Sequence, residues 1–409
     1  MNNLDEKLAK LEHEILKDQD ISIVNLVEYL IEKADQDRVS DIHIDPTFDS
    51  LKIRFRIDGV LQEAYHLPKK VHEEAISRIK VLCKLRTDEH QSAQDGRFRY
   101  TFLNSKHFID IRVSIVPTYH GENVVMRLLS DKSENLTLED LGFSAEDKSK
   151  IIKALRKPYG MILSTGPTGS GKTTTLYTLI KILSSSEISI ITIEDPVEYA
   201  VSDIEQIQVN TKTGLTFANG LRSILRQDPN VIMVGEIRDK ETASIAVNTA
   251  LTGHLLLSTI HTNDSYTAIP RLLDMGIEEY LIASTVSLII GQRLVRKICE
   301  ECKEKYEMSE FDKDIFKNIN DKNNNSYTHL YKGMGCKRCK KTGYSGRVSI
   351  NEVLIADEAI KEAILRKASN KELKEISEKQ GMTTMFVDGL NKALLGVTTV
   401  EEVYRVINE

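Results

Sequence analysis

Residues 161–175 read MILSTGPTGSGKTTT, and this stretch decides the fold of the larger part of the chain. An apolar run of strand character leads directly into a glycine-rich loop, and a helix-forming segment follows the loop. The stretch fits the pattern G-x-x-x-x-G-K-[ST], in which backbone N–H groups and a helix N-terminus surround a phosphate group. The sequence therefore predicts a phosphate-binding loop formed by Gly166, Pro167, Thr168, Gly169, Ser170, Gly171, Lys172, Thr173 and Thr174.

The loop also indicates which nucleotide is bound and how it is held. We expect Lys172 to reach the β- and γ-phosphates and the Thr173 hydroxyl to ligate Mg²⁺. The alternative is a fortuitous glycine-rich turn, which is disfavoured because a strand precedes the loop and a helix follows it. A GTPase would carry the guanine-reading pattern N-K-x-D, whose nearest match, Asn391-Lys392-Ala393-Leu394, lacks the acid. ATP is therefore the favoured nucleotide.

Two further strands end in acidic residues. The run VIMV is followed by Gly235 and Glu236, and ISIITIE ends at Glu194, with Asp195 and Glu198 after it. The carboxyl ends of parallel strands meet at one edge of a sheet, where ligands bind. We expect Glu236 to support the metal ion and Glu194 to orient or deprotonate the attacking water. Solvated loop charge is the alternative, and it weighs more for Asp195 and Glu198.

Lys172, Glu194 and Glu236 are thus the candidate catalytic residues. Two histidines, His254 and His261, flank another apolar strand, LLLSTI. Each of them either senses phosphate or fills a polar site in the fold, and composition does not separate these two interpretations.

The pattern of apolar residues divides the chain into domains. From residue 133 onward, the apolar strands MILST, ISIITIED, VIMVGE and LLLSTI alternate with helices, which predicts an α/β domain with a largely parallel sheet covered on both faces. Residues 39–132 change to a period of two, with the strands SDIHIDP, KIRFRIDG, GRFRYT and FIDIRVSI and one helix, EEAISRIKVLCKL, so an α+β domain is expected there.

The two ends of the chain are predicted to be helical. Residues 1–38 form two short helices, the first with the apolar stripe Leu4, Leu8, Leu11 and Ile15 and the second capped by Ser22. At the other end, residues 350–409 are expected to be C-terminal helices that complete the domain of residues 133–409.

Composition limits the classes of function. The chain has 409 residues, 41 % of them apolar, and a formal net charge of −6, so as a whole it is not built to attract nucleic acid or anionic lipid. The first twenty residues lack the apolar block of a signal peptide, and no apolar run is long enough to span a bilayer. We therefore expect a cytosolic protein, or one that is peripheral to a membrane through a partner.

Four of the five cysteines form two C-x-x-C pairs, Cys299 with Cys302 and Cys336 with Cys339. Two such pairs supply four thiolates for tetrahedral Zn²⁺, and 33 residues separate the pairs, more than is usual. Disulfides or free thiols are the alternative, disfavoured in a reducing compartment. No spare ligand lies nearby, so residues 297–342 are interpreted as a structural zinc element. The lone Cys83 is expected to pack in a core.

Four motifs taken in order resemble those of the secretion ATPase superfamily: GPTGSGKTTTLY, ITIEDPVEY, RQDPNVIMVGEIRDKETA and LTGHLLLSTIHTND. Further segments are similar to those of the type II secretion and type IV pilus assembly ATPases: SDIHIDP, RFRIDG, QDGRF, DIRVSIVPTYHGENVVMRLL and QRLVRKIC. Together they cover about residues 39–355. The resemblance implies a RecA-like ATPase domain preceded by a PAS-like domain.

The same resemblance implies a way of working. Such ATPases are homohexamers at the cytoplasmic face of the inner or plasma membrane. Their ATP turnover acts on a polytopic membrane platform protein, which adds pilin-like subunits to a growing filament, and no direct contact with nucleic acid is expected. The tetracysteine element favours assembly over pilus retraction. Only about 38 residues precede SDIHIDP, so the chain is closest in shape to the short competence pseudopilus ATPase of DNA uptake.

Arginines on the polar face of the first domain's sheet fit this interpretation. By strand alternation Arg54, Arg97 and Arg112 lie on one face, and the resemblance implies that they meet nucleotide phosphate. Ordinary salt bridges to acids on adjacent strands are an equally weighted alternative. Arg226, Arg238 and Arg271 are weaker candidates.

Three alternative functions stay open at this point. A nucleic-acid translocase or conjugation-type motor would need a basic pore, a pilus retraction ATPase would lack the tetracysteine element, and a nucleotide-gated scaffold would bind ATP without hydrolysing it.

Overall fold

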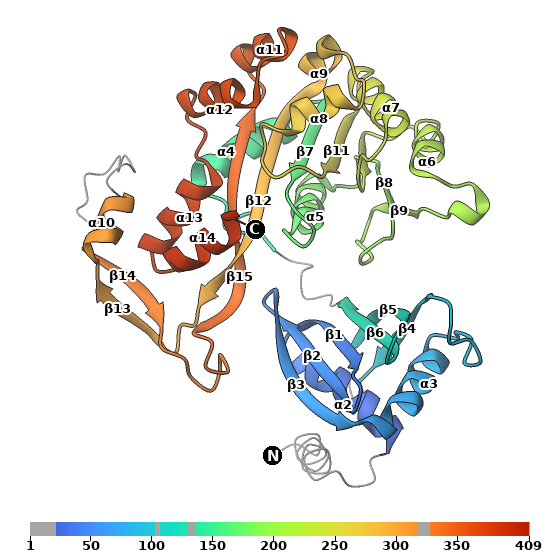
Figure 1. Cartoon of the computed structure of the whole chain (residues 1–409). Coiled ribbons are helices and arrows are strands. Elements are labelled where there is room, and N and C mark those ends of the chain that lie inside the picture. The colour runs from blue at the N-terminus through green and yellow to red at the C-terminus, as the bar shows by residue number, and fades with distance from the viewer. Residues whose placement is uncertain (1–21, 103–106, 130–135, 317–327, 409) are drawn as a thin grey trace. The chain divides into compact units, whose positions relative to one another are not determined.

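The computed structural model describes residues 22–102, 107–129, 136–316 and 328–408, and the chain divides into two compact units, Met1–Lys132 and Ser133–Glu409 (Figure 1). The predicted helix with the stripe Leu4 to Ile15 lies outside the described residues.

The first unit is built on a six-stranded antiparallel sheet of order β3-β2-β1-β6-β5-β4. Alternating apolar and polar residues form these strands, and the apolar set of each strand is buried on one face. The strands are β1 (Val39–Pro46), β2 (Ser50–Ile57), β3 (Val60–Pro68), β4 (Gln94–Thr101), β5 (Phe108–Thr118) and β6 (Gly121–Leu129). Prediction missed β6 and also β3, an edge strand in which most residues are half-buried and no clear alternation is visible.

Two helices pack on the apolar face of this sheet. They are α2 (Ile23–Gln36) and α3 (His72–Leu82), the latter preceded by a short 3₁₀ turn, η1 (Lys69–Val71). Leu30 of α2 and Ile79 of α3 belong to the same core as Ile42 of β1 and Ile111 of β5. Ser22 is the N-cap of α2, and Cys83 lies buried at the end of α3 in that core.

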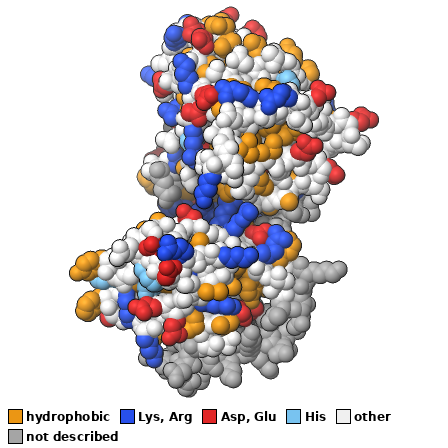
Figure 2. Space-filling model, turned by 90° about the vertical axis from the view of Figure 1, so that its right-hand side faces the viewer, with side chains coloured by type: hydrophobic (Ala, Val, Ile, Leu, Met, Phe, Trp, Pro, Cys, Tyr) orange, Lys and Arg blue, Asp and Glu red, His pale blue; other side chains and the backbone are white. Residues whose placement is uncertain are grey.

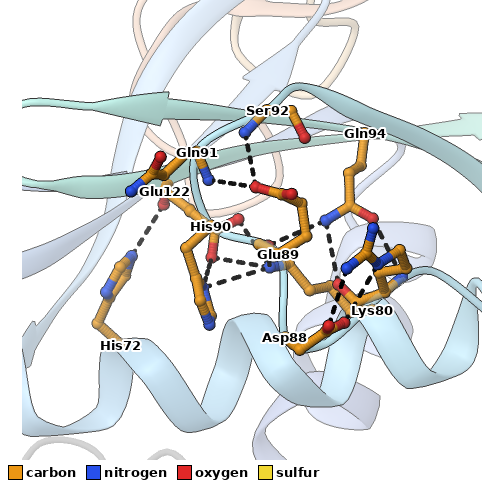
Figure 3. Close-up of polar contacts among 10 residues, drawn as sticks. His72, Lys80, Asp88, Glu89, His90, Gln91, Ser92, Gln94 and Glu122 are labelled. Carbon is orange, nitrogen blue, oxygen red and sulfur yellow. Dashed lines mark hydrogen bonds and ion pairs between the residues drawn. The ribbon is translucent and has the colours of Figure 1, made fainter.

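A buried ion pair fastens α3 to β6. The Lys80 ammonium donates to Glu122 at 2.9 Å and to the backbone carbonyl of Glu89 at 2.6 Å (Figure 3). His90 lies 2.8 Å from the same carboxylate, and His72 reaches the backbone carbonyl of Glu122 at 2.8 Å. The pair therefore holds the loop after α3 against the sheet, and each buried charge has partners close by.

The second unit is built on a seven-stranded sheet of order β15-β12-β7-β11-β10-β8-β9, in which only β15 runs antiparallel to its neighbour. The strands are β7 (Gly160–Thr165), β8 (Ile190–Glu194), β9 (Glu205–Gln208), β10 (Val231–Val234), β11 (Leu255–Ile260), β12 (Val286–Ile298) and β15 (Tyr344–Ile355). The predicted α/β class with a largely parallel sheet is therefore confirmed. Every residue of β7, β8, β10 and β11 is buried, as expected of strands covered on both faces.

Helices cover both faces of this sheet (Figure 1). One face packs against α4 (Ala145–Leu155) and α5 (Lys172–Leu183). The opposite face packs against α6 (Phe217–Ile224), α7 (Lys240–Leu251), α8 (Ala268–Asp274), α9 (Glu279–Thr285), α11 (Glu358–Leu365) and α12 (Asn370–Lys379). A 3₁₀ turn, η3 (Thr211–Thr213), lies between β9 and α6.

The long strands β12 and β15 lead away from the sheet to a small accessory region. It contains a two-stranded sheet of β13 (Lys303–Glu307) and β14 (His329–Gly333), the helix α10 (Glu310–Phe316), and the C-terminal helices α13 (Met385–Leu394) and α14 (Val400–Asn408). Glu402 of α14 is buried and accepts hydrogen bonds from Arg296 of β12 and from Arg405. The hydrogen bonds between Glu402 and Arg296 attach α14 to β12.

The C-terminal region requires one correction. Residues 350–355, predicted as helical, are the end of β15. Both faces of this strand are buried, so its apolar residues do not alternate, and their spacing imitates that of a helix. The predicted helices begin at α11.

The surface is mixed, and on the face drawn in Figure 2 hydrophobic side chains are scattered among charged and polar ones. In the described ranges, no helix has both the length and the apolar character needed to cross a membrane.

Candidate nucleotide site and metal centre

The glycine-rich loop joins β7 to α5, and its conformation depends on glycine. Gly166 and Gly171 have φ values of 140° and 88°, in the region that residues with a side chain rarely adopt. A Cβ on Gly166 would also lie 2.3 Å from the backbone oxygen of Gln292. The chain therefore turns sharply after β7, and the first helical residue is Lys172. This places the free N–H groups of a helix N-terminus at the edge of the sheet where an anion binds.

Lys172 is held inside this loop. Its ammonium donates to the carbonyl oxygens of Gly166 at 2.8 Å and Pro167 at 2.9 Å. Burial lowers the pKa of Lys172 to about 8, although the charge of Glu236 acts in the opposite direction. The structure thus brings two of the three candidate catalytic residues within electrostatic reach of each other.

Glu236 lies just beyond β10, next to the end of β8. The backbone N–H of Gly235 donates to Ile193 at 2.7 Å, which holds the two strand ends together. The Glu236 carboxylate is buried and contacts Arg238 Nε at 2.7 Å and His261 Nε2 at 3.0 Å. A carboxylate at a strand end within electrostatic reach of the loop lysine could hold a metal ion through its water ligands.

Glu194, the last residue of β8, points inward. Its side chain accepts hydrogen bonds from Thr192 Oγ1 at 2.6 Å, Gln206 Nε2 at 3.3 Å and the Tyr177 hydroxyl, and the residue is only 2 % exposed. Burial raises the pKa of Glu194 above its ordinary value, and the three hydrogen bonds partly counteract this rise. Because Tyr177 belongs to α5, the helix that begins at the phosphate loop also provides a hydrogen-bond donor to this carboxylate.

The two histidines lie at opposite ends of β11. His261 follows the strand and contacts Glu236, whereas His254 precedes it and contacts the backbone oxygen of Thr249 at 3.3 Å. A strand of this length separates them by roughly 20 Å. Only His261 is therefore part of the candidate site. Arg226, by contrast, donates back to the preceding helix α6, to the backbone oxygen of Arg222 at 2.9 Å and to the Ser223 hydroxyl at 3.1 Å.

Among the residues of the site that were not predicted are Tyr177, Gln206 and Gln292. Each is polar within or beside an apolar stretch, which is the signal that was available in the sequence. Gln292 lies in the run VSLIIGQRLV of β12, and its side chain contacts the phosphate loop. Their partners in the site are 12 to 122 residues away along the chain, so local patterns do not identify the contacts.

The candidate arginines of the first unit form part of a row across its sheet. Arg97 of β4 is directly opposite Arg112 of β5, and Arg112 is opposite Arg127 of β6. Next in the row is Asp41 of β1, which contacts Arg127 at 2.9 Å and Arg56 at 3.3 Å. Burial alone would raise the pKa of Asp41, but hydrogen bonds and the charges of these arginines lower it. The row therefore carries an excess of positive charge.

Arg54 is different, because its guanidinium is engaged by an acid. It contacts Asp45 of the adjacent strand at 2.6 Å. The salt-bridge alternative therefore describes Arg54 in this structure.

The four cysteines of the two pairs come together at the end of β12. Their Sγ atoms all lie within 4.8 Å of one another, with Cys299 to Cys336 and Cys302 to Cys339 both at 3.8 Å. Four sulfurs at 2.3 Å from a tetrahedral Zn²⁺ would be about 3.8 Å apart. Backbone N–H groups of Gly335 and Cys336 also donate to sulfurs of the cluster. The residues present therefore fit Zn²⁺, and four cysteine ligands would complete the tetrahedron, as in a structural site.

Comparisons with known proteins cover nearly the whole chain. A family model described as "Type II/IV secretion system protein" matches residues 16–405. The chain is 46 % identical over 387 residues to the type II secretion system protein E of Xanthomonas campestris pv. campestris. This alignment covers 95 % of this chain and 68 % of that protein. It is 44 % identical over 384 residues to the type IV pilus assembly ATPase PilB of Myxococcus xanthus, 94 % of this chain and 68 % of that protein.

A solved structure is similar over the same extent. The pilus retraction motor PilT, determined with bound ADP, has a TM-score of 0.62 and 25 % sequence identity, and the alignment covers 92 % of this chain and 95 % of that one.

Proposed function

The chain belongs to the Type II/IV secretion system protein family, and on that premise we propose that it hydrolyses ATP to drive assembly of a type IV pilus-like or type II secretion pseudopilus filament. The resemblance predicted from the motifs is thereby confirmed at the level of the family. The relatives named above are a secretion protein E and a pilus assembly ATPase, and this proposal carries their activity over to this chain.

One observation carries the proposal: Lys172, buried in a glycine loop at a helix N-terminus, lies within the field of Glu236 at the end of a neighbouring strand. The lysine and the oriented N–H groups favour a polyphosphate, whose charge would in turn favour the protonated lysine. Burial of these groups strengthens each interaction, because water does not screen it.

The proposed roles follow from position. The loop residues and Lys172 hold the phosphates, and Glu194 orients the attacking water or takes its proton. Glu194 has this role only when its carboxylate is deprotonated, a state that its hydrogen bonds from Tyr177 and Thr192 favour. His261 and Arg238 keep Glu236 in place.

Two metal ions are implied. The Thr173 hydroxyl and Glu236 would hold Mg²⁺, which neutralises charge on the transferred phosphate. The four cysteines Cys299, Cys302, Cys336 and Cys339 would hold Zn²⁺ as a structural cross-link.

We further infer a homohexamer that binds a polytopic membrane protein at the cytoplasmic face of the membrane. In this arrangement Arg97 and Arg112 contact nucleotide phosphate when subunits close around it, while Arg54 is held by Asp45. The four-cysteine cluster supports assembly over retraction, since a retraction ATPase is expected to lack it.

The test compares Lys172→Ala with the wild-type chain and with a matched control, Lys153→Ala, at an exposed position of α4. We expect Lys172→Ala to lower the steady-state ATPase rate by on the order of a hundredfold or more while the protein stays folded, because a buried charge at the phosphates is removed. Lys153→Ala should match the wild type. Wild-type turnover by Lys172→Ala would refute the proposal.

A further inference from the structure

Gln292 contacts the phosphate loop, yet it comes from β12, 121 positions after Gly171 in sequence. The residue is 1 % exposed, and its strand β12 is the direct neighbour of β7, the strand that leads into the loop. An isolated carboxamide in a strand as apolar as VSLIIGQRLV needs partners, because an unsatisfied buried amide costs free energy.

Its side chain makes two hydrogen bonds, one as a donor and one as an acceptor. The Gln292 Nε2 donates to the backbone oxygen of Ser170, inside the loop, at 2.8 Å. Its Oε1 accepts from the Thr175 hydroxyl, in the first turn of α5, at 2.7 Å. The carboxamide therefore bridges the loop and the helix that follows it, on either side of Lys172.

The loop glycines are packed directly against the same residue. A Cβ on Gly171 would lie 2.9 Å from Gln292 Nε2, and one on Gly166 would lie 2.3 Å from the backbone oxygen of Gln292. Gln292 thus packs directly against both glycine turns of the loop. Its position determines where the loop N–H groups point.

The chemistry of the bridge admits few substitutes. Ser170 offers a carbonyl, which only accepts, while the Thr175 hydroxyl is used here as a donor. A carboxamide matches both, since it has one donor end and one acceptor end. A glutamate of the same shape would set an acceptor against the Ser170 carbonyl, and leucine would leave both groups unpaired in a buried place.

We propose that Gln292 is a positioning residue for nucleotide binding: through Ser170 and Thr175 it holds the phosphate loop in the conformation that grips the nucleotide. This inference rests on the proposed function. The loop contacts phosphate both before and during hydrolysis, so Gln292 contributes to binding in the ground state and the transition state alike. Loss of the bridge raises KM and the Kd for nucleotide and leaves kcat much less affected.

The test uses the full-length chain with Gln292→Glu and Gln292→Leu. The matched control is Gln380→Glu, the same exchange at an exposed position at the end of α12. Mg-ADP binding is measured by calorimetry, and KM and kcat for ATP by steady-state assay. Both Gln292 variants should weaken Mg-ADP binding and raise KM by about tenfold or more, the value of one to two buried hydrogen bonds. Gln380→Glu should bind as the wild type does.

Thr175 gives a second, independent route. Thr175→Val removes the hydroxyl with little change of shape and should raise KM in the same direction, while Thr175→Ser should lie much nearer to the wild type. The double variant Gln292→Leu/Thr175→Val should lose less free energy of nucleotide binding than the two single variants lose in sum, because the two side chains share one interaction.

The outcomes separate the two proposals. A fall in kcat with unchanged KM and unchanged Mg-ADP affinity would show that Gln292 only supports folding, and affinities within twofold of wild type for both Gln292→Glu and Thr175→Val would overturn the inference. A wild-type chain that binds no Mg-ADP would refute the proposed function, and this inference with it.

Discussion

At Glu194, burial and hydrogen bonding act against each other. Removal from water favours the protonated carboxyl, whereas donors from Thr192, Tyr177 and Gln206 favour the carboxylate. A group intended to take a proton from water must be deprotonated at working pH. The three donors therefore decide over which pH range Glu194 is available as a base.

This balance predicts the effect of Tyr177→Phe. The variant removes a donor to the carboxylate, so the pKa of Glu194 rises further and the acid limb of the kcat profile moves to higher pH. On that limb we expect a rate roughly tenfold below that of the wild type. The difference should shrink at alkaline pH, where Glu194 is deprotonated in both proteins.

The measurement is ATPase rate against pH at saturating Mg-ATP, with Tyr280→Phe, an exposed tyrosine of α9, as the matched control. An acid limb that stays in place in Tyr177→Phe would remove Glu194, or its hydrogen bond to Tyr177, from the rate-limiting chemistry.

Individual residues of the site were predictable where a pattern fixes both the residue type and its place. The loop and the acids at the ends of β8 and β10 are of this kind, because strand ends converge on one edge of a sheet. The same rule would have separated the histidines, since only His261 follows its strand. Gln206 and Gln292 were not predictable in the same way, because their partners are set by which strands lie side by side.

Among the elements, β13 and β14 depend most on their surroundings. Two strands alone are at best marginally stable in water, and this pair is flanked by the cysteine cluster on one side and a small apolar core on the other. Cys302 directly precedes β13, and Cys336 is the third residue after the end of β14. A metal bound by the four thiols would therefore hold both strands at their open end.

We expect removal of the metal, by Cys302→Ser or by a strong chelator under reducing conditions, to increase backbone hydrogen exchange in Lys303–Glu307 and His329–Gly333. Exchange in β7 and β10, inside the large sheet, should change little. Hydrogen exchange with mass spectrometry and zinc analysis measures both effects, and Cys83→Ser, a thiol outside the cluster, is the control. Protein that contains no zinc after reducing purification, or unchanged exchange in β13 and β14, would contradict the expectation.

Elements were predictable to the extent that their burial is one-sided or their apolar runs are short and bounded. The alternating strands β1, β2, β4 and β5 and the buried runs of β7, β8, β10 and β11 meet this condition. β12 and β15 do not, because polar residues and Gly interrupt their apolar residues although most of β12 and the central part of β15 are buried. Their pairing across some sixty residues is a tertiary property.

For the molecule as a whole, the arginine row on the first unit's sheet is a local concentration of positive charge in a chain of net charge −6. The row Arg97, Arg112 and Arg127 has Asp41 as its acidic neighbour across the strands. Like charges side by side are unfavourable unless an anion offsets them. We proposed above that nucleotide phosphate is this anion.

The double variant Arg97→Ala/Arg112→Ala should therefore lower the ATPase rate of the assembled protein by at least about tenfold, since charge that stabilises the transition state is lost. Mg-ADP affinity should change less, because the phosphate loop belongs to the other unit. Arg99→Ala is the matched control, on the same strand and face but paired with Asp110 at 2.8 Å. A double variant with full activity would leave the arginine row without a catalytic role.

The thiol cluster also governs how the purified protein ages. Sulfurs 3.7 to 3.8 Å apart need to move less than 2 Å to reach disulfide-bond length once nothing holds them apart. Preparations kept in chelator without a reductant should thus acquire internal cross-links between neighbouring thiols. Storage with zinc and a phosphine reductant is the appropriate precaution before any assay of the motor.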